Sequence, residues 1–205
     1  MGQTVLYLIR HGQTKWNLEE RMQGHKDSPL TEVGISQAQK LRDRLMNEKV
    51  DLIYSSESKR AYDTAKIIQH NRNIPINTRK ELKEIHMGKW EGMNQTDIIN
   101  RYPETWENFW NNPSIYVPTD KGESYEELKA RVIPSIEEII NLNQGKSIII
   151  VTHRITLKVI MSHFMNQNIC DICENPDIES ASLSKIHIEN EVSKILLYGD
   201  ISHYK

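Results

Sequence analysis

The sequence predicts an α/β fold, namely a three-layer α/β/α sandwich with a mainly parallel central sheet. Two apolar runs rich in β-branched residues, at 5–9 and 147–151, are typical of strands that are buried on both faces. Between them, short strands alternate with segments that have the apolar period of amphipathic helices. This alternation favours parallel strand pairing, with helices on both faces of the sheet.

The first helix is expected to begin after Thr31, whose side chain can cap it, with Glu32 in the first turn. Apolar residues then recur at helical spacing and would form its buried face: Ile35, Ala38, Leu41, Leu45 and Met46. A second short strand is predicted at 51–54, where two serines end it, and a helix follows at about 57–70.

The remaining regular elements follow in order: a strand at 74–79, a helix at 123–142, the strand at 147–151 and a helix at 155–166. The stretch at about 85–122 holds three of the four tryptophans and has little clean periodicity. We interpret it as a helical, lid-like excursion from a single domain that spans residues 1–205. Alternating apolar residues at 182–199 predict a hairpin at the sheet edge, which is compatible with a homodimer without requiring one.

The overall charge argues against nucleic acid and membrane surfaces as partners. Lys and Arg total 26 against 28 Asp and Glu, which gives a formal net charge of -2. A chain with this balance has no overall basic field to attract nucleic acid or an anionic membrane. Any anion that the protein binds must therefore be held locally, by a few placed cations.

Other features of the sequence point to a cytoplasmic location. No apolar run approaches the roughly 18–20 residues that a membrane span requires, and the first residues lack the basic segment and cleavage site of a secretory signal. The two cysteines, Cys170 and Cys173, cannot form a four-ligand zinc site by themselves. We interpret them as ordinary thiols of a reducing compartment, with a redox pair as the alternative.

Charged and imidazole side chains follow the predicted strands. Arg10 and His11 end the first buried strand, His153 follows the last one, and Arg60 lies one turn into the helix after the middle strand. Because ligands of such folds bind beyond the carboxyl ends of the strands, we expect these residues to meet. The sequence contains neither a Walker loop nor a GxGxxG pattern, so it does not support nucleotide binding by a glycine loop.

Two chemistries could use this cluster. The histidines could bind a divalent metal together with a carboxylate such as Glu84. However, each arginine would repel a dication at ~5 Å by roughly 6–7 kcal/mol at an effective dielectric near 20. Arginine is instead the preferred forked donor for a phosphate dianion. A neutral imidazole beside a bound phosphate can attack phosphorus and form a covalent intermediate, so we expect a metal-free anion pocket.

The segment Leu8–Thr14, with Arg10, His11 and Gly12, resembles the Arg-His-Gly signature of the histidine phosphatase (phosphoglycerate mutase-like) superfamily. The resemblance covers about residues 5–165. Further motifs that are similar to those of the family follow in order: Asn17, 21–24, 27–31, 55–56 with 60–65, 82–85 with 88–92, 122–124 and 151–153.

The resemblance implies a role for each of several residues. His11 would be the nucleophile that becomes phosphohistidine, and Glu84 would protonate the leaving oxygen and then activate water. The phosphoryl group and the nearby substrate would be held by a further set: Arg10, Asn17, Gln23, Gly24, Arg60 and His153. Asn17 and Gln23 could equally serve only to shape their loop. No metal and no organic cofactor is implied, and the partner would be a small-molecule phosphoester.

Three functions remain open at this point: a phosphomonoester phosphatase, a cofactor-dependent phosphoglycerate mutase, and a non-catalytic member that only binds phosphate. Mutases of the family follow the catalytic glutamate with an arginine that grips the substrate, whereas Ile85 follows Glu84 here. This difference favours the phosphatase. Many relatives have glycine after the second histidine, whereas Arg154 follows His153 here. A bulky cation at this position could narrow the pocket or add a substrate contact, so the departure leaves open which phosphoester fits.

Overall fold

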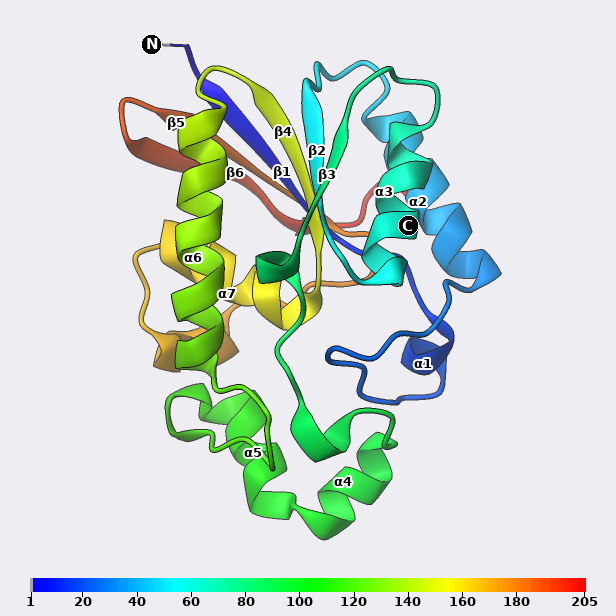
Figure 1. The fold of residues 1–205 in the computed structure, drawn as a ribbon, viewed down its shortest axis with the longest axis vertical. Coiled ribbons are helices and arrows are strands. Elements are labelled where there is room, and N and C mark those ends of the chain that lie inside the picture. Colours follow the sequence, from blue (N-terminus) through cyan, green and yellow to red (C-terminus); the bar gives the residue numbers. More distant parts are fainter. Residues whose placement is uncertain (1) are drawn as a thin grey trace.

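The computed structural model describes residues 2–205 and contains one six-stranded sheet with the strand order β3-β2-β4-β1-β5-β6 (Figure 1). The four strands from β3 to β1 are parallel, and β5 and β6 are antiparallel to their neighbours. The strands are β1 (Thr4–Arg10), β2 (Leu52–Ser56), β3 (Ile76–Arg79), β4 (Ser147–Thr152), β5 (Leu183–Glu189) and β6 (Val192–Asp200).

Helices cover both faces of this sheet, so the α/β/α sandwich with a mainly parallel sheet is confirmed. Helices α2 and α3 pack together against one face, and α6 and α7 pack together against the other (Figure 1). The helices are α1 (Lys15–Leu18), α2 (Glu32–Arg44), α3 (Lys59–Gln69), α4 (Gln95–Arg101), α5 (Pro103–Asn111), α6 (Tyr125–Leu142) and α7 (Arg154–Phe164).

The two predicted apolar runs form the centre of the sheet because both of their faces are buried. Successive side chains of a strand point to opposite faces. In β1, Leu6 and Leu8 join the core under α6 and α7, whereas Tyr7 and Ile9 join the core under α2 and α3. Ile148–Val151 of β4 divides in the same way between the two cores. This double burial fixes where both strands end.

Three details of the sequence interpretation were wrong. Strand β2 continues through the two serines that were expected to end it, because both pair with β3. Ile35 is exposed because the buried face of α2 follows Gly34, Ala38 and Leu41 instead. Met46 is exposed because α2 ends at Arg44 and Met46 lies in the turn beyond it.

Residues 85–122 leave the sheet and build a group of packed aromatic rings that is continuous with the core under α6 and α7. Trp90 is fully buried at its centre, with its ring 5.6 Å from that of Phe109 and 5.8 Å from that of Trp106. Helices α4 and α5 lie beyond the carboxyl ends of the parallel strands (Figure 1). A search of the described residues finds no helix of the length and apolarity that a membrane span needs.

The loop after β1 lies directly against the first turn of α2. A Cβ atom on Gly12 would lie 2.5 Å from the backbone oxygen of Gly34, which is closer than real Cβ contacts. Two glycines therefore allow the two backbones to touch. This contact, together with a hydrogen bond from the Gly12 N–H to the Thr64 hydroxyl at 3.1 Å, holds the residue after His11 in place.

Candidate active site

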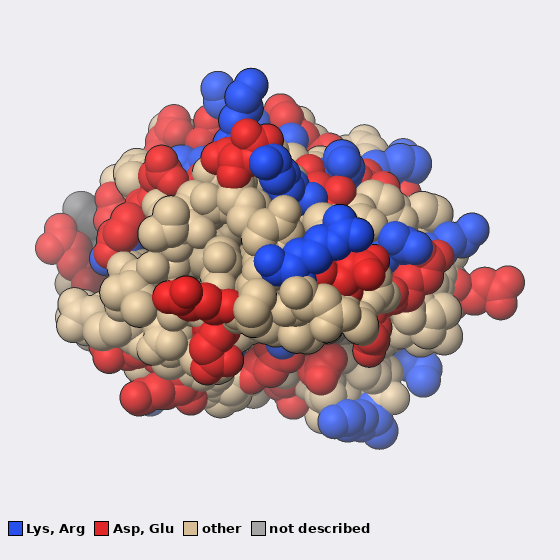
Figure 2. Space-filling model, turned by 90° about the horizontal axis from the view of Figure 1, so that it is seen from below, with Lys and Arg blue, Asp and Glu red and all other residues tan. Residues whose placement is uncertain are grey.

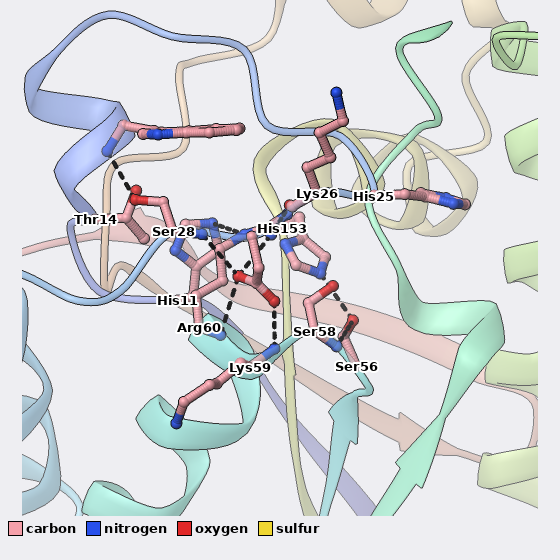
Figure 3. Close-up of polar contacts among 12 residues, drawn as sticks. His11, Thr14, His25, Lys26, Ser28, Ser56, Ser58, Lys59, Arg60 and His153 are labelled. Atoms are coloured by element: carbon pink, nitrogen blue, oxygen red, sulfur yellow. Dashed lines mark hydrogen bonds and ion pairs between the residues drawn. The ribbon is translucent and has the colours of Figure 1, made fainter. Parts of the chain in front are cut away.

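Two histidines and an arginine from three strand ends meet at the carboxyl end of the parallel strands (Figure 3). His11 follows β1, His153 follows β4, and Arg60 lies in the first turn of α3 after β2. The two imidazole rings are 5.2 Å apart, edge to face, and Arg60 Nε lies 3.3 Å from His11 Nε2. All three side chains are buried. The parallel sheet therefore brings together residues that are far apart in the sequence.

The tautomer of His11 follows from its contacts. Its Nδ1 lies 2.8 Å from the carbonyl oxygen of Gly12, and a carbonyl only accepts, so Nδ1 carries the proton. Burial, and then the charges of Arg60 and Arg10, lower the pKa of His11 well below its ordinary value. The ring is thus neutral at pH 7, and the lone pair on Nε2 faces Arg60.

Arg60 is fixed by acceptors on one loop. Its guanidinium donates to the carbonyl oxygens of Gly24 and Lys26 at 2.9 and 2.8 Å and to the Asp27 carboxylate at 3.0 Å. Asp27 also accepts from the backbone N–H of Lys59 at the start of α3. Asp27 lies within one of the motifs of the sequence, but its two contacts, with Arg60 and with the first turn of α3, are visible only in the fold.

Arg10 is almost fully buried and points across the same site. Its Nη1 donates to the carbonyl oxygen of Ile178 at 2.7 Å, whereas its buried Nε has no hydrogen-bond partner within residues 2–205. Burial, and then the charge of Arg154, lower the pKa of Arg10 to about 10, so it remains a cation at neutral pH. A buried cationic N–H without a partner is suited to an incoming anion.

His153 lies behind His11 and is oriented by Ser56. Its Nε2 lies 2.8 Å from the Ser56 hydroxyl, and its buried Nδ1 has no hydrogen-bond partner in the described chain. Burial, and then the charge of Arg60, lower the pKa of His153 well below its ordinary value. His153 is fully buried and does not line the pocket. It could therefore contact a substrate only on the side of the site where His11 lies.

The Glu84 carboxylate lies at the N-terminus of α7. One oxygen accepts from the backbone N–H groups of Ile85 and Thr156 and from the Thr156 hydroxyl, at 3.0–3.1 Å. The other oxygen accepts from the backbone N–H of Ile155 at 3.2 Å. The first helix turn, which has free N–H groups and a positive end, thereby fixes the carboxylate beside the strand that delivers His153.

These residues open into one pocket, whose volume counted to its open mouth is about 520 Å³. Of the predicted site residues, it is lined by Arg10, His11, Asn17, Gln23, Gly24, Arg60 and Glu84. The side-chain amide oxygen of Asn17 accepts from the backbone N–H and the hydroxyl of Thr14, so this side chain does shape its loop. The side-chain amide oxygen of Gln23 is buried, has no hydrogen-bond partner within residues 2–205 and is available for substrate.

Other sites of the sequence lie outside this pocket. Cys170 and Cys173 are free thiols in a 3-10 segment after α7. No group of three or more His, Cys, Asp or Glu side chains suited to a metal ion occurs within residues 2–205.

Acidic and basic side chains are interspersed on the lower end of the molecule in Figure 1, without a large patch of either sign (Figure 2). The pocket itself is lined by more arginines than glutamates.

The fold and this site define a family. The family model of the histidine phosphatase superfamily (branch 1) matches residues 6–201, and the chain belongs to this superfamily. It is 31% identical over 202 residues to a metal-independent phosphoserine phosphatase of Arabidopsis thaliana, covering 98% of this chain and 83% of the relative. It is also 31% identical over 160 residues to the adenosylcobalamin/alpha-ribazole phosphatase of Escherichia coli, covering 78% of each.

A solved structure agrees over the whole fold. Bacillus stearothermophilus YhfR superposes with a TM-score of 0.95 at 37% identity and covers 98% of this chain and 100% of its own. With its family, its relatives and its anion pocket, the chain is a phosphoric monoester hydrolase of the phosphoglycerate mutase-like fold.

The lowered pKa values of the two buried histidines predict acid-sensitive stability. In the unfolded chain histidine binds a proton near pH 6.5, whereas folded His11 and His153 do so only at lower pH. Unfolding therefore takes up protons below about pH 6.5, and the free energy of unfolding falls there by up to roughly 1.4 kcal/mol per pH unit for each histidine. Above about pH 6.5, these two histidines no longer lower the free energy of unfolding. Urea unfolding between about pH 5 and pH 7 measures the slope.

The matched comparison uses His11→Gln. Below about pH 6.5, the free energy of unfolding of this variant should fall less steeply with decreasing pH than that of the wild type. His163→Gln, which removes a partly exposed histidine of α7, controls for the loss of a histidine as such. Identical slopes for the wild type and His11→Gln would contradict the assignment of a neutral, buried His11.

Proposed function

We propose that the protein hydrolyses small phosphomonoesters through a phosphohistidine on His11. One observation carries the proposal: the Nε2 lone pair of a neutral His11 faces a buried arginine, while Nδ1 is tied to a carbonyl. An imidazole held in this way can attack only through Nε2, at the point where the phosphate charge would be bound.

We further propose that the chain is one domain, with the excursion at 85–122 closing over the pocket, since Met87 and Trp110 line it.

In the proposed first step, Arg10 and Arg60 bind the phosphoryl oxygens and hold phosphorus in front of His11. Arg60 already donates to loop carbonyls, so its position is set before the substrate arrives. His153 would donate through Nδ1 when Nε2 accepts from Ser56, and Asn17 and Gln23 would contact the substrate further out. As the Nε2–P bond forms, the bond between phosphorus and the ester oxygen breaks.

Glu84 would supply the proton for the leaving oxygen. It lines the same pocket and is held by the first turn of α7, which fixes its direction. In the second step the carboxylate takes a proton from water, the water oxygen bonds to phosphorus, and the Nε2–P bond breaks, which releases phosphate and restores His11.

The geometry supports a phosphatase over a mutase. A mutase must keep the substrate in place to return the phosphoryl group, and family mutases are similar in using an arginine after the glutamate for this grip. Ile85 occupies that position and is fully buried in the core, so it offers no grip in the pocket. We therefore expect water to accept the phosphoryl group. The relatives named above act on phosphoserine and alpha-ribazole phosphate according to their names, which supports small phosphorylated metabolites as the substrate class.

Turnover of p-nitrophenyl phosphate tests this function. The wild type should hydrolyse it in the presence of EDTA, because the arginines take the place of a metal at the phosphate, and vanadate should inhibit it. His11→Ala should lose at least about a thousandfold in kcat/KM, since the two-step route requires the nucleophile. His163→Ala is the control. Activity that EDTA abolishes and a divalent ion restores would overturn the charge argument.

The role of Glu84 is tested by the leaving group. An alkoxide needs a proton as it departs, whereas nitrophenolate hardly does. Glu84→Gln should slow the burst of enzyme phosphorylation by alkyl phosphates by roughly 100- to 10,000-fold, the usual span for one general acid. The burst with p-nitrophenyl phosphate should slow much less. Stopped-flow or quench measurements with both esters separate this step from later hydrolysis, and equal slowing of the two bursts would remove Glu84 from the acid role.

A further inference from the structure

Arg154 forms part of the pocket wall but has no part in the proposed chemistry. It is the first residue of α7, directly after His153, and it lines the same pocket as Arg10 and Glu84. Its side chain is 31% exposed, in contrast to the buried arginines of the phosphate site. It therefore lies on the outer wall, where the leaving group of a phosphoester would extend.

The guanidinium of Arg154 is held in one orientation. Its Nε and Nη2 each donate to the Asp177 carboxylate at 2.7 Å, as a two-point pair. Its plane packs over the ring of Trp110 from α5, with Cζ 4.5 Å from the ring centre. A side chain fixed on two sides loses little further conformational freedom when it binds a ligand. The arginine is thus a rigid part of the wall rather than a mobile surface charge.

One nitrogen of this guanidinium remains available. Nη1 makes no hydrogen bond within residues 2–205, and it is not among the buried unpaired atoms of that range. Arg154 is therefore an outer cation with an open donor. Arg21, the other arginine on the outer wall, donates through Nε to Glu19 and through Nη1 to the Gly92 carbonyl, but its side chain is more exposed, at 42%.

The charges around the pocket show what this donor can take. Four arginines line it against two glutamates: Arg10, Arg21, Arg60 and Arg154, with Glu20 and Glu84. Arg10 and Arg60 serve the phosphate. After burial, the charge of Arg154 lowers the pKa of Arg10, and the charge of Asp177 acts in the opposite direction. A single negative charge on the leaving group would lie between Arg10 and Arg154.

We propose that Arg154 is a specificity-determining residue that selects phosphomonoesters whose leaving group carries a carboxylate, which are phosphorylated hydroxy acids and amino acids. The carboxylate would accept from Nη1 while Asp177 keeps Nε and Nη2, an arrangement that the five donors of arginine permit. The inference rests on the proposed phosphatase function and adds the class of its substrate.

Matched substrates test the carboxylate. Phosphoserine and phosphoethanolamine differ only by that group, and 3-phosphoglycerate and glycerol 3-phosphate differ by a carboxylate in place of a hydroxymethyl group. The wild type should give a higher kcat/KM for the acid of each pair. In Arg154→Met the ratio within each pair should fall by roughly 10- to 100-fold, the range for one hydrogen bond between charged groups. Arg101→Met, an exposed arginine of α4, is the control and should keep the wild-type ratios.

Ratios keep the test independent of folding and of the chemistry at phosphorus. The role of Arg154 would be overturned if Arg154→Met lowered kcat/KM equally for both substrates of a pair. It would also be overturned if the wild type did not prefer the carboxylate-bearing substrate of each pair. Arg154→Gln, which keeps a polar side chain without the charge, provides the same comparison if the methionine variant does not fold. Loss of p-nitrophenyl phosphate hydrolysis in the wild type would instead count against the proposed function, because that ester has no carboxylate.

Discussion

The burial of two guanidinium groups beside two neutral imidazoles is the constraint on which the rest of the site depends. An unpaired buried charge costs several kcal/mol, so each arginine needs acceptors before a substrate arrives. Arg60 finds them in Asp27 and in the carbonyls of Gly24 and Lys26, and Arg10 finds one in Ile178. These partners leave some N–H donors without an acceptor, such as the buried Nε of Arg10. The remaining donors form a positively charged site that matches a phosphate dianion.

The same constraint connects distant parts of the chain. The loop at 24–27 holds Arg60, and its Asp27 caps α3, so the position of the arginine and the start of its helix are set together. The segment before β5 supplies Ile178 to Arg10 and Asp177 to Arg154. It therefore links the C-terminal hairpin to both the phosphate site and the outer wall. Trp110 extends this link to the excursion at 85–122.

The sequence predicted the parts of the fold that burial on both faces determines. The strands at 5–9 and 147–151 are so apolar that only the centre of a sheet can bury them, and their ends carry His11 and His153. Contacts that depend on tertiary structure could not be predicted in this way. The pairing of Asp27 with Arg60 joins a loop to a helix, and the Ser56 contact of His153 requires β2 to continue through both serines. Ile35 was misplaced because helical periodicity does not show that Gly34 makes the close contact.

The proposed mechanism requires that His11 attack phosphorus through Nε2, because the Gly12 carbonyl fixes the proton on Nδ1. Rapid quenching of the enzyme with a phosphoester, followed by mass spectrometry and by phosphorus NMR of the denatured phosphoenzyme, tests it most directly. The account predicts an acid-labile phosphoryl group on the peptide that contains His11, bonded at Nε2. A phosphoryl group on any other residue, or on Nδ1 of His11, would contradict it.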